Sequence, residues 1–169
     1  MRFAYKTIHS PVGKLKLVAS NKGLVAVLWE NDRANRVRLG ELVRGHSHPV
    51  LVEAEWQLGE YFEGKRRSFS IALDMRGTSF QRNVWEALLA IPFGETRSYR
   101  DLAKKLGNPG ATRAVGAANG RNPISIIVPC HRVIGSNGRL TGFAGGLEAK
   151  ARLLELEQGI ELSNSIRRR

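Results

Sequence analysis

Cysteine is the residue that this sequence most clearly lacks, because Cys130 is the only one in 169 residues. A single thiol excludes an intramolecular disulfide and any zinc site built from several cysteines. His9, His46 and His48 are too scattered to predict a metal site either. We therefore expect a protein that binds no metal and works in the reducing cytoplasm.

Long apolar runs are missing as well. No stretch approaches the roughly 18 apolar residues that cross a bilayer, and residues 1–6 lack the apolar core of a signal peptide. We expect a soluble protein with no membrane partner. Its 42% share of hydrophobic residues is enough for one or two small domains that fold unaided.

Acidic residues are absent from one long stretch, residues 102–147, although the chain has 15 of them. The basic residues in this stretch are Lys104, Lys105, Arg113, Arg121, Arg132 and Arg139, in a chain of net charge +12. An acid-free basic stretch around the only thiol meets the electrostatic demands of nucleic-acid binding. A merely basic, soluble surface is the alternative at this point.

The apolar pattern changes near residues 75–79, which predicts an N-terminal domain, 1–75, and a C-terminal domain, 78–169. In the first, β-rich runs between turn residues predict a small antiparallel sheet with strands over 3–7, 15–19, 24–29 and about 69–73. Helical spacing of apolar residues predicts one amphipathic helix, which Gly64 ends; the residues are Leu51, Ala54, Leu58, Tyr61 and Phe62.

The C-terminal domain has a helical pattern. One helix is expected after a cap at Thr78 or Ser79, and it stops before Pro92. A capping-box start at Ser98 predicts a short helix closed by Gly107, and a second helix follows over 111–118. Two short helices joined by a tight turn indicate a helix-turn-helix, with the Cys130 strand and residues 135–138 as a wing. The second helix is rich in small residues, which suit close packing against another helix or insertion into a DNA groove.

Residues 124–134 contain the candidate nucleophile, Cys130. The branched side chains before Pro129 predict a buried, stiff strand that delivers Cys130. In a continuing strand Cys130 and His131 point to opposite faces, so a thiol–imidazole contact needs a turn or a bridging water. The imidazole and a neighbouring arginine such as Arg132 would lower the pKa of the thiol. The alternative is a buried cysteine that acts as a small hydrophobe.

Three motifs resemble, in their order, the signature of the O6-alkylguanine-DNA alkyltransferases. They are Arg113-Ala-Val-Gly116, Asn122-Pro123 and residues 129–133 (Pro-Cys-His-Arg-Val). These proteins are also called methylated-DNA–protein-cysteine methyltransferases, and the similarity is to the bacterial housekeeping type. It covers nearly the whole chain and is strongest over residues 78–159. The resemblance implies an α+β fold with a ribonuclease H-like N-terminal domain and a winged-helix-like C-terminal domain.

The resemblance also implies DNA repair by a suicide reaction without a cofactor, in which Cys130 takes the alkyl group from O6-alkylguanine, or from O4-alkylthymine, in duplex DNA. His131 resembles the base that deprotonates the thiol through water, and Glu157 the group that orients the imidazole. Asn122 resembles the brace of the active-site turn. Tyr99 resembles the tyrosine that ejects the nucleotide and bonds the extruded base.

Further implied roles concern DNA. Arg113 resembles the arginine that fills the gap left by the extruded base. The other implied DNA-binding residues are Ala111, Thr112, Ala114, Gly116, Ala117 and Tyr99, and the implied substrate pocket comprises Val133, Phe143, Ala144 and Gly145. The protein is expected to act as a monomer that can assemble cooperatively on DNA.

The chain departs from the family pattern at a few positions. Phe143 and Ala144 stand where many relatives have Tyr and Ser, so hydroxyl contacts from these positions are absent, and Thr112 replaces an alanine. Three other classes stay open: a non-catalytic lesion-binding relative, a winged-helix regulator and a thiol hydrolase with a Cys-His dyad. Stoichiometry separates them, because only transfer modifies each protein molecule once.

Overall fold

The computed structural model describes residues 2–159, which form two compact units. The first unit extends to Arg76 and also includes Pro123–Ser125. The second unit comprises Gly77–Asn122 and the described residues from Ile126 onward. None of the helices within residues 2–159 is long and apolar enough to cross a membrane.

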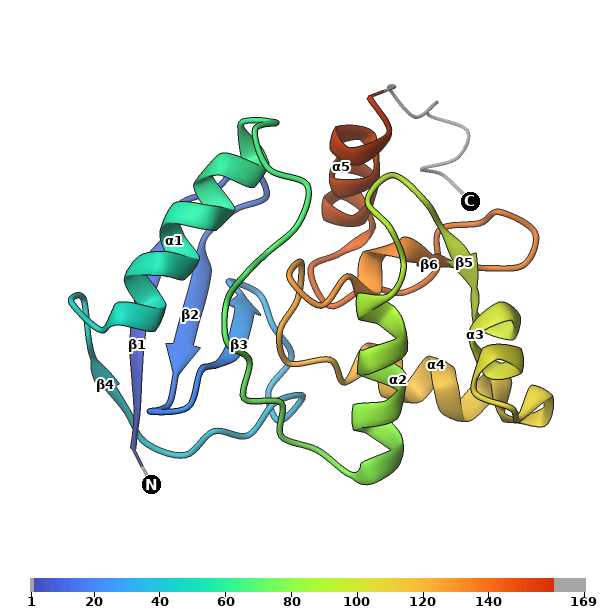
Figure 1. The fold of residues 1–169 in the computed structure, drawn as a ribbon, viewed down its shortest axis with the longest axis horizontal. Coiled ribbons are helices and arrows are strands. Elements are labelled where there is room, and N and C mark those ends of the chain that lie inside the picture. Colours follow the sequence, from blue (N-terminus) through green and yellow to red (C-terminus); the bar gives the residue numbers. More distant parts are fainter. Residues whose placement is uncertain (1, 160–169) are drawn as a thin grey trace. The chain divides into compact units, whose positions relative to one another are not determined.

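The first unit is a four-stranded sheet with one helix packed on it (Figure 1). The strands are β1 (Phe3–Ile8), β2 (Leu15–Ala19), β3 (Leu24–Trp29) and β4 (Leu42–Arg44), in the order β3-β2-β1-β4. The first three pair antiparallel, as predicted, whereas β4 pairs parallel to β1. Sequence reasoning missed β4 because three residues are too few to show alternation.

Helix α1 (Pro49–Phe62) confirms the predicted amphipathic helix. It buries Leu51, Ala54, Leu58 and Tyr61, which recur at helical spacing. A separate apolar cluster, built around Phe3, Val18, Val25 and Ala26, completes the core of the sheet. Gly64, just beyond the helix, has φ +77°, a conformation that glycine adopts without strain.

The strand predicted near residues 69–73 is wrong. Only Leu73 forms a bridge, parallel to Leu24, and the backbone N–H of Ser70 donates to Oε1 of Gln57 (2.9 Å). A buried side chain on α1 takes up this N–H group, and the segment meets β3 only at Leu24, which donates to the Ala72 carbonyl (2.8 Å) and accepts from the Asp74 N–H (2.8 Å). Gly23 lies so close to the Ala72 carbonyl that a Cβ would sit 2.5 Å from its oxygen.

The second unit is mainly helical (Figure 1). Its helices are α2 (Ser79–Leu89), α3 (Tyr99–Lys105), α4 (Thr112–Gly120) and α5 (Leu147–Gln158), and its two short strands, β5 (Arg97–Ser98) and β6 (Val133–Ile134), pair parallel. Thr78 and Ser98 both form complete capping boxes at the starts of α2 and α3, which confirms the predicted helix starts.

The helix-turn-helix is confirmed in α3 and α4. The two helices pack against each other and against α2, and Nε1 of Trp85 on α2 donates to the Ala118 carbonyl on α4 (2.9 Å). Gly107, with φ +77°, ends α3 as predicted. The inner side of α4 buries Val115, Ala118 and Asn119, so the neighbouring small residues lie on its outer side.

The predicted strand over residues 124–128 is also wrong. Ile124 forms only an isolated parallel bridge to Val27, and Ile126 has φ +74°, which breaks any extended run. Cys130–Arg132 is a short 3₁₀ helix, so Cys130 is not on a strand of a wing. The branched side chains are still buried, but burial without a run of backbone hydrogen bonds to a neighbouring strand does not make a strand.

Candidate active site and DNA-binding face

A chain of tight turns positions Cys130. Its backbone N–H donates to the Val128 carbonyl (2.8 Å) across Pro129, whose φ of −82° and ψ of 65° are those of an inverse γ-turn. Nδ2 of Asn122 donates to the same carbonyl (2.8 Å). Asn122 therefore braces the turn, and Cys130 is held there only 4% exposed.

His131 and Glu157 form a buried pair. Nε2 of His131 lies 2.7 Å from Oε2 of Glu157, and both side chains are fully buried. Burial lowers the pKa of His131 more than the carboxylate raises it, so the imidazole is neutral near pH 7. Since a carboxylate only accepts, the proton sits on Nε2 and leaves the lone pair on Nδ1. Nδ1 makes no hydrogen bond within the described residues.

Arg132 is the third member of this group. Its Nε and Nη2 donate to the two oxygens of Glu157 (2.7 and 3.0 Å), and Nη1 donates to the Ile91 carbonyl (2.6 Å). Burial alone would raise the pKa of Glu157, but the bonds and charge of its partners outweigh burial and hold the pKa well below its ordinary value. Because His131 is neutral, Arg132 supplies that charge through its two hydrogen bonds to the carboxylate.

Lys150 is a functional candidate that sequence reasoning missed. It lies on α5, fully buried, and its Nζ donates to the Val133 carbonyl (2.6 Å) and, at 3.4 Å, to the Thr141 carbonyl. Burial lowers its pKa to about 8, against a smaller opposite effect of Cys130. The available signal was the spacing of Lys150 and Glu157, seven residues apart on a leucine-rich helix, which puts both on its buried face.

Tyr99 belongs to the same neighbourhood as Cys130. It begins α3, and its hydroxyl is hydrogen-bonded to Oγ1 of Thr141 (2.6 Å). Burial raises the pKa of Tyr99, and Cys130 contributes in the same direction. Gly116 on α4 faces the ring, because a Cβ there would lie 3.7 Å from its Cδ1. The ring thus lies between α4 and the segment that follows β6.

The predicted pocket residues lie on both sides of Lys150. Val133, at the start of β6, is buried, and its carbonyl receives the lysine hydrogen bond. The Phe143 ring centroid lies 5.9 Å from the ammonium, and Ala144 and Gly145 follow in the same loop, partly buried. One buried cation thereby joins the strand after Cys130 to the loop expected over the base.

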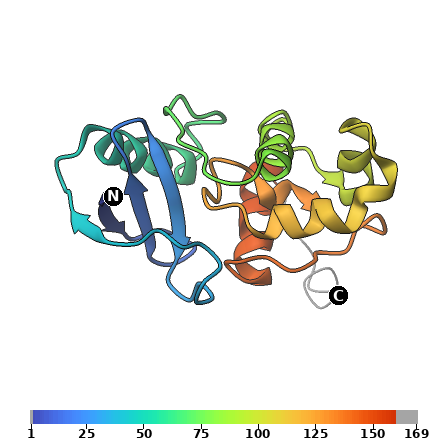
Figure 2. The same ribbon diagram turned by 90° about the horizontal axis from the view of Figure 1, so that it is seen from below.

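Helix α4, the orange-yellow helix of the second unit in Figure 2, carries the residues for which sequence analysis predicted DNA contact. Arg113, Ala114 and Ala117 are exposed, and Ala111, Thr112 and Gly116 are partly exposed. Of the two roles considered for the small residues, an exposed row fits groove contact better than internal helix packing. Within residues 2–159, no group of three or more His, Cys, Asp or Glu side chains is arranged to hold a metal ion.

Two family profiles match this chain, one to each part. The 6-O-methylguanine DNA methyltransferase ribonuclease-like domain matches residues 3–75, and the DNA binding domain of the same family matches residues 79–159. The methylated-DNA–protein-cysteine methyltransferase of Mycolicibacterium paratuberculosis is 49% identical over 154 residues, covering 91% of this chain and 92% of the relative. That of Methanosarcina acetivorans is 48% identical over 153 residues, covering 90% and 97%.

Solved structures agree. The crystal structure of Mycobacterium tuberculosis OGT in complex with DNA has a TM-score of 0.86 and 47% identity, over 92% of this chain and 93% of that one. These matches confirm the resemblance and the two-part α+β fold that it implied, including the ribonuclease-like first domain. The chain therefore belongs to the 6-O-methylguanine DNA methyltransferase family.

Proposed function

We propose that this protein repairs DNA by direct, irreversible transfer of the alkyl group of O6-alkylguanine to Cys130. The observation that carries the proposal is a lone buried thiol on a braced turn, next to a histidine whose free lone pair is set by a buried carboxylate. Relatives that are 48–49% identical to this chain are named methylated-DNA–protein-cysteine methyltransferases. DNA is the partner. The protein acts as a methyltransferase, and each molecule carries out one transfer.

The chemistry follows from the tautomer of His131. The thiol proton passes through a bridging water to Nδ1, and the imidazolium that forms is stabilised by Glu157 through Nε2–H. The thiolate attacks the alkyl carbon, the carbon–O6 bond breaks, and its electron pair stays on the guanine, which takes up a proton. A thioether does not hydrolyse, so the protein is consumed and needs no cofactor.

Access to the alkyl carbon requires that the base leave the stack. Extrusion costs a few kcal/mol and is cheapest for a damaged, poorly paired base. Arg113, exposed on α4, fills the vacated position, while the small residues around it let the helix approach the groove. Tyr99 ejects the nucleotide and then bonds the extruded base. Val133 and the loop of Phe143, Ala144 and Gly145 enclose it.

Further parts of the proposal concern organisation. The chain comprises an N-terminal domain, 1–75, and a C-terminal domain, 78–169, which carries the residues for DNA binding and alkyl transfer. The protein reacts as a monomer, and cooperative assembly along DNA stays a prediction. A cytoplasmic location, which the single reduced thiol favours, stays a prediction as well.

The deciding experiment is intact-protein mass spectrometry after incubation with duplex DNA that contains O6-methylguanine. We expect at most one added methyl group per chain, located on Cys130 by peptide mapping, and no gain in Cys130→Ser. A second arm with O4-methylthymine tests the wider substrate range. Repair of many lesions per protein molecule, or undiminished repair by Cys130→Ser, would refute the proposal.

A further inference from the structure

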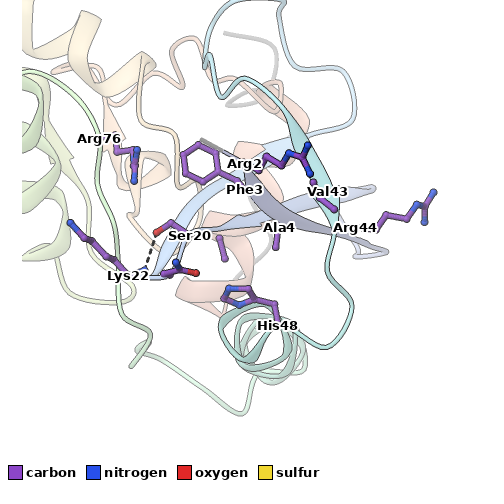
Figure 3. Close-up of a pocket in the computed structure, with 11 residues that line it drawn as sticks. Arg2, Phe3, Ala4, Ser20, Lys22, Val43, Arg44, His48 and Arg76 are labelled. Atoms are coloured by element: carbon purple, nitrogen blue, oxygen red, sulfur yellow. Dashed lines mark hydrogen bonds between the residues drawn. The ribbon is translucent and has the colours of Figure 1, made fainter.

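The first unit contains a basic pocket of about 330 Å³, far in sequence from the residues of the active site. Its walls come from the start of β1, the turn after β2, β4, the cap of α1 and the segment that ends at Arg76 (Figure 3). Four cations line it, Arg2, Lys22, Arg44 and Arg76, over an apolar floor that includes Phe3. The fold has therefore gathered positive charges from four separate segments around one hollow.

The charge of this pocket is only partly neutralised. No carboxylate is among its lining residues. Arg2 pairs with Glu41 at 3.3 Å, but both side chains are largely exposed, so water screens the pair. Lys22 and Arg44 form no ion pair with any residue of the part of the chain that the structure describes. Lys22 still acts on the nearby Asp74 carboxylate, whose pKa its charge helps to lower. Within residues 2–159, four lining cations with only Asp74 and Glu41 as neighbouring carboxylates still favour an anionic ligand.

Several contacts fix the orientation of the Arg76 guanidinium. Its Nε and Nη2 both donate to Oδ2 of Asp74 (3.2 and 2.9 Å), and Asp74 in turn accepts from Oγ of Ser20 (2.6 Å). The guanidinium also lies over the Phe3 ring, 4.8 Å from its centroid. These contacts fix the plane of the guanidinium and leave Nη1 to donate to a ligand.

His48 adds a neutral donor on another wall. It caps α1, and its Nδ1 accepts from the Val50 N–H (3.2 Å). A neutral imidazole that accepts through Nδ1 carries its proton on Nε2. Figure 3 shows this ring at the α1 end of the pocket, below Ala4. The start of the 14-residue helix α1 contributes the positive end of its dipole to the same region.

We infer that this pocket binds a backbone phosphate of DNA away from the damaged nucleotide. The inference rests on the proposed function, because DNA is the polyanion that such a protein meets. Planar arginines match phosphate oxygens in pairs, whereas lysine acts as a point charge, and the pocket offers both kinds of donor. The first unit thereby adds ionic contacts that do not depend on sequence or damage.

The test compares two double variants with equal charge loss. Lys22→Gln/Arg44→Gln removes the two unpaired cations of the pocket. Lys14→Gln/Arg38→Gln removes two exposed cations of the same unit that lie outside it. Binding of an undamaged duplex is measured by fluorescence anisotropy from low to moderate salt. We expect the pocket variant to lose about tenfold in affinity and about 0.9 in salt slope for each contact removed, and the control to lose less than about twofold.

Two results would overturn the inference. Equal losses in both double variants would mean that diffuse charge, and not the pocket, attracts DNA, and unchanged binding by the pocket variant would remove the contact altogether. In a parallel arm, inorganic phosphate is titrated and amide NMR shifts are followed. Shifts at Lys22 and Arg44 with unchanged DNA affinity would identify a site for free phosphate and contradict the DNA contact.

The failure of this inference is separable from failure of the repair function. All variants are also incubated with a saturating excess of duplex containing O6-methylguanine, and the mass of the intact protein is measured. We expect one methyl group on Cys130 in both double variants, because neither changes the second unit. A parent protein that gains no methyl group would refute the repair function, whatever the pocket binds.

Discussion

The two units differ in what they bury. The interior of the first is mainly apolar, with three uncharged polar residues, Ser20, Gln57 and Ser125. Among its described residues Arg36 is the one buried charged side chain, and it is paired with Asp32, four residues away. The second unit buries a histidine, an arginine, a lysine and a glutamate around its only thiol. Charges are costly to desolvate and add little net stability when buried. The comparison teaches that the interior of the second unit is organised for chemistry, and that of the first for stability.

The backbones differ in the same way. The first unit consists of regular strands and one long helix, whereas the site is built on turns in which Ile126 has φ +74°. A branched residue in that region is strained by about 1–3 kcal/mol. The buried surroundings of Ile126 and the brace from Asn122 hold the strained segment in place. Substitutions at the buried charges and at the Asn122 brace therefore test this difference between the two units.

Glu157→Gln is expected to have the largest effect. It removes the carboxylate that neutralises Arg132 and orients His131, and loss of one member of a buried ion pair costs about 3–5 kcal/mol. Urea unfolding at pH 7 measures the loss, and single-turnover transfer should slow in the same variant. Glu86→Gln, exposed on α2, is the matched control and should change stability by less than about 0.5 kcal/mol.

The pH dependence makes the Glu157 test sharper. The pKa of this carboxyl is held below its unfolded value by its cationic partner, so its stabilising contribution is complete above about pH 5 and is lost as the pH falls. The parent should lose more free energy of unfolding than Glu157→Gln between about pH 5 and pH 3. Identical acid slopes in the two proteins would contradict the assignment.

Lys150→Met tests how burial of a second cation, Lys150, affects the free energy of unfolding. The pKa of Lys150 is lowered to about 8 in the folded state from an ordinary value of 10.5, mainly by burial. Between these values the unfolded state binds more protons, so the parent's free energy of unfolding should rise with pH, by up to about 3 kcal/mol. The variant should lack this rise in urea unfolding, whereas Lys105→Met, exposed on α3, should keep it. A rise that survives in Lys150→Met would exclude this lysine as its source.

Sequence reasoning succeeded where local pattern determines structure. Strands β1 to β3 are β-rich runs bounded by turn residues, so they were predictable. The capping boxes at Thr78 and Ser98 each lie within four consecutive residues, so the helix starts were predictable as well. It failed over residues 124–128, where branched side chains are buried by tertiary packing without a sheet. It also missed Lys150, because burial of a single lysine depends on what packs against α5, which local periodicity does not report.

The brace at Asn122 is expected to matter less for stability and more for rate. Asn122→Ala removes the hydrogen bond to the buried Val128 carbonyl, a loss of about 1–3 kcal/mol. Because the same carbonyl anchors the Cys130 turn, transfer should slow at saturating DNA while affinity for undamaged duplex stays unchanged. Asn137→Ala, in an exposed turn, is the control. A variant that is destabilised but transfers at the parent's rate would show that the brace is only structural.

Arg113→Ala should have the smallest effect on the fold and a specific effect on function. Its side chain is exposed on α4, so the free energy of unfolding should change by less than about 0.5 kcal/mol. If the arginine holds the base out of the stack, the transfer rate should fall about tenfold or more, well beyond the loss of duplex affinity at low salt. Arg121→Ala removes the same charge at the other end of the helix and should lower affinity without that excess. Equal losses of rate and affinity in Arg113→Ala would reduce its role to phosphate attraction.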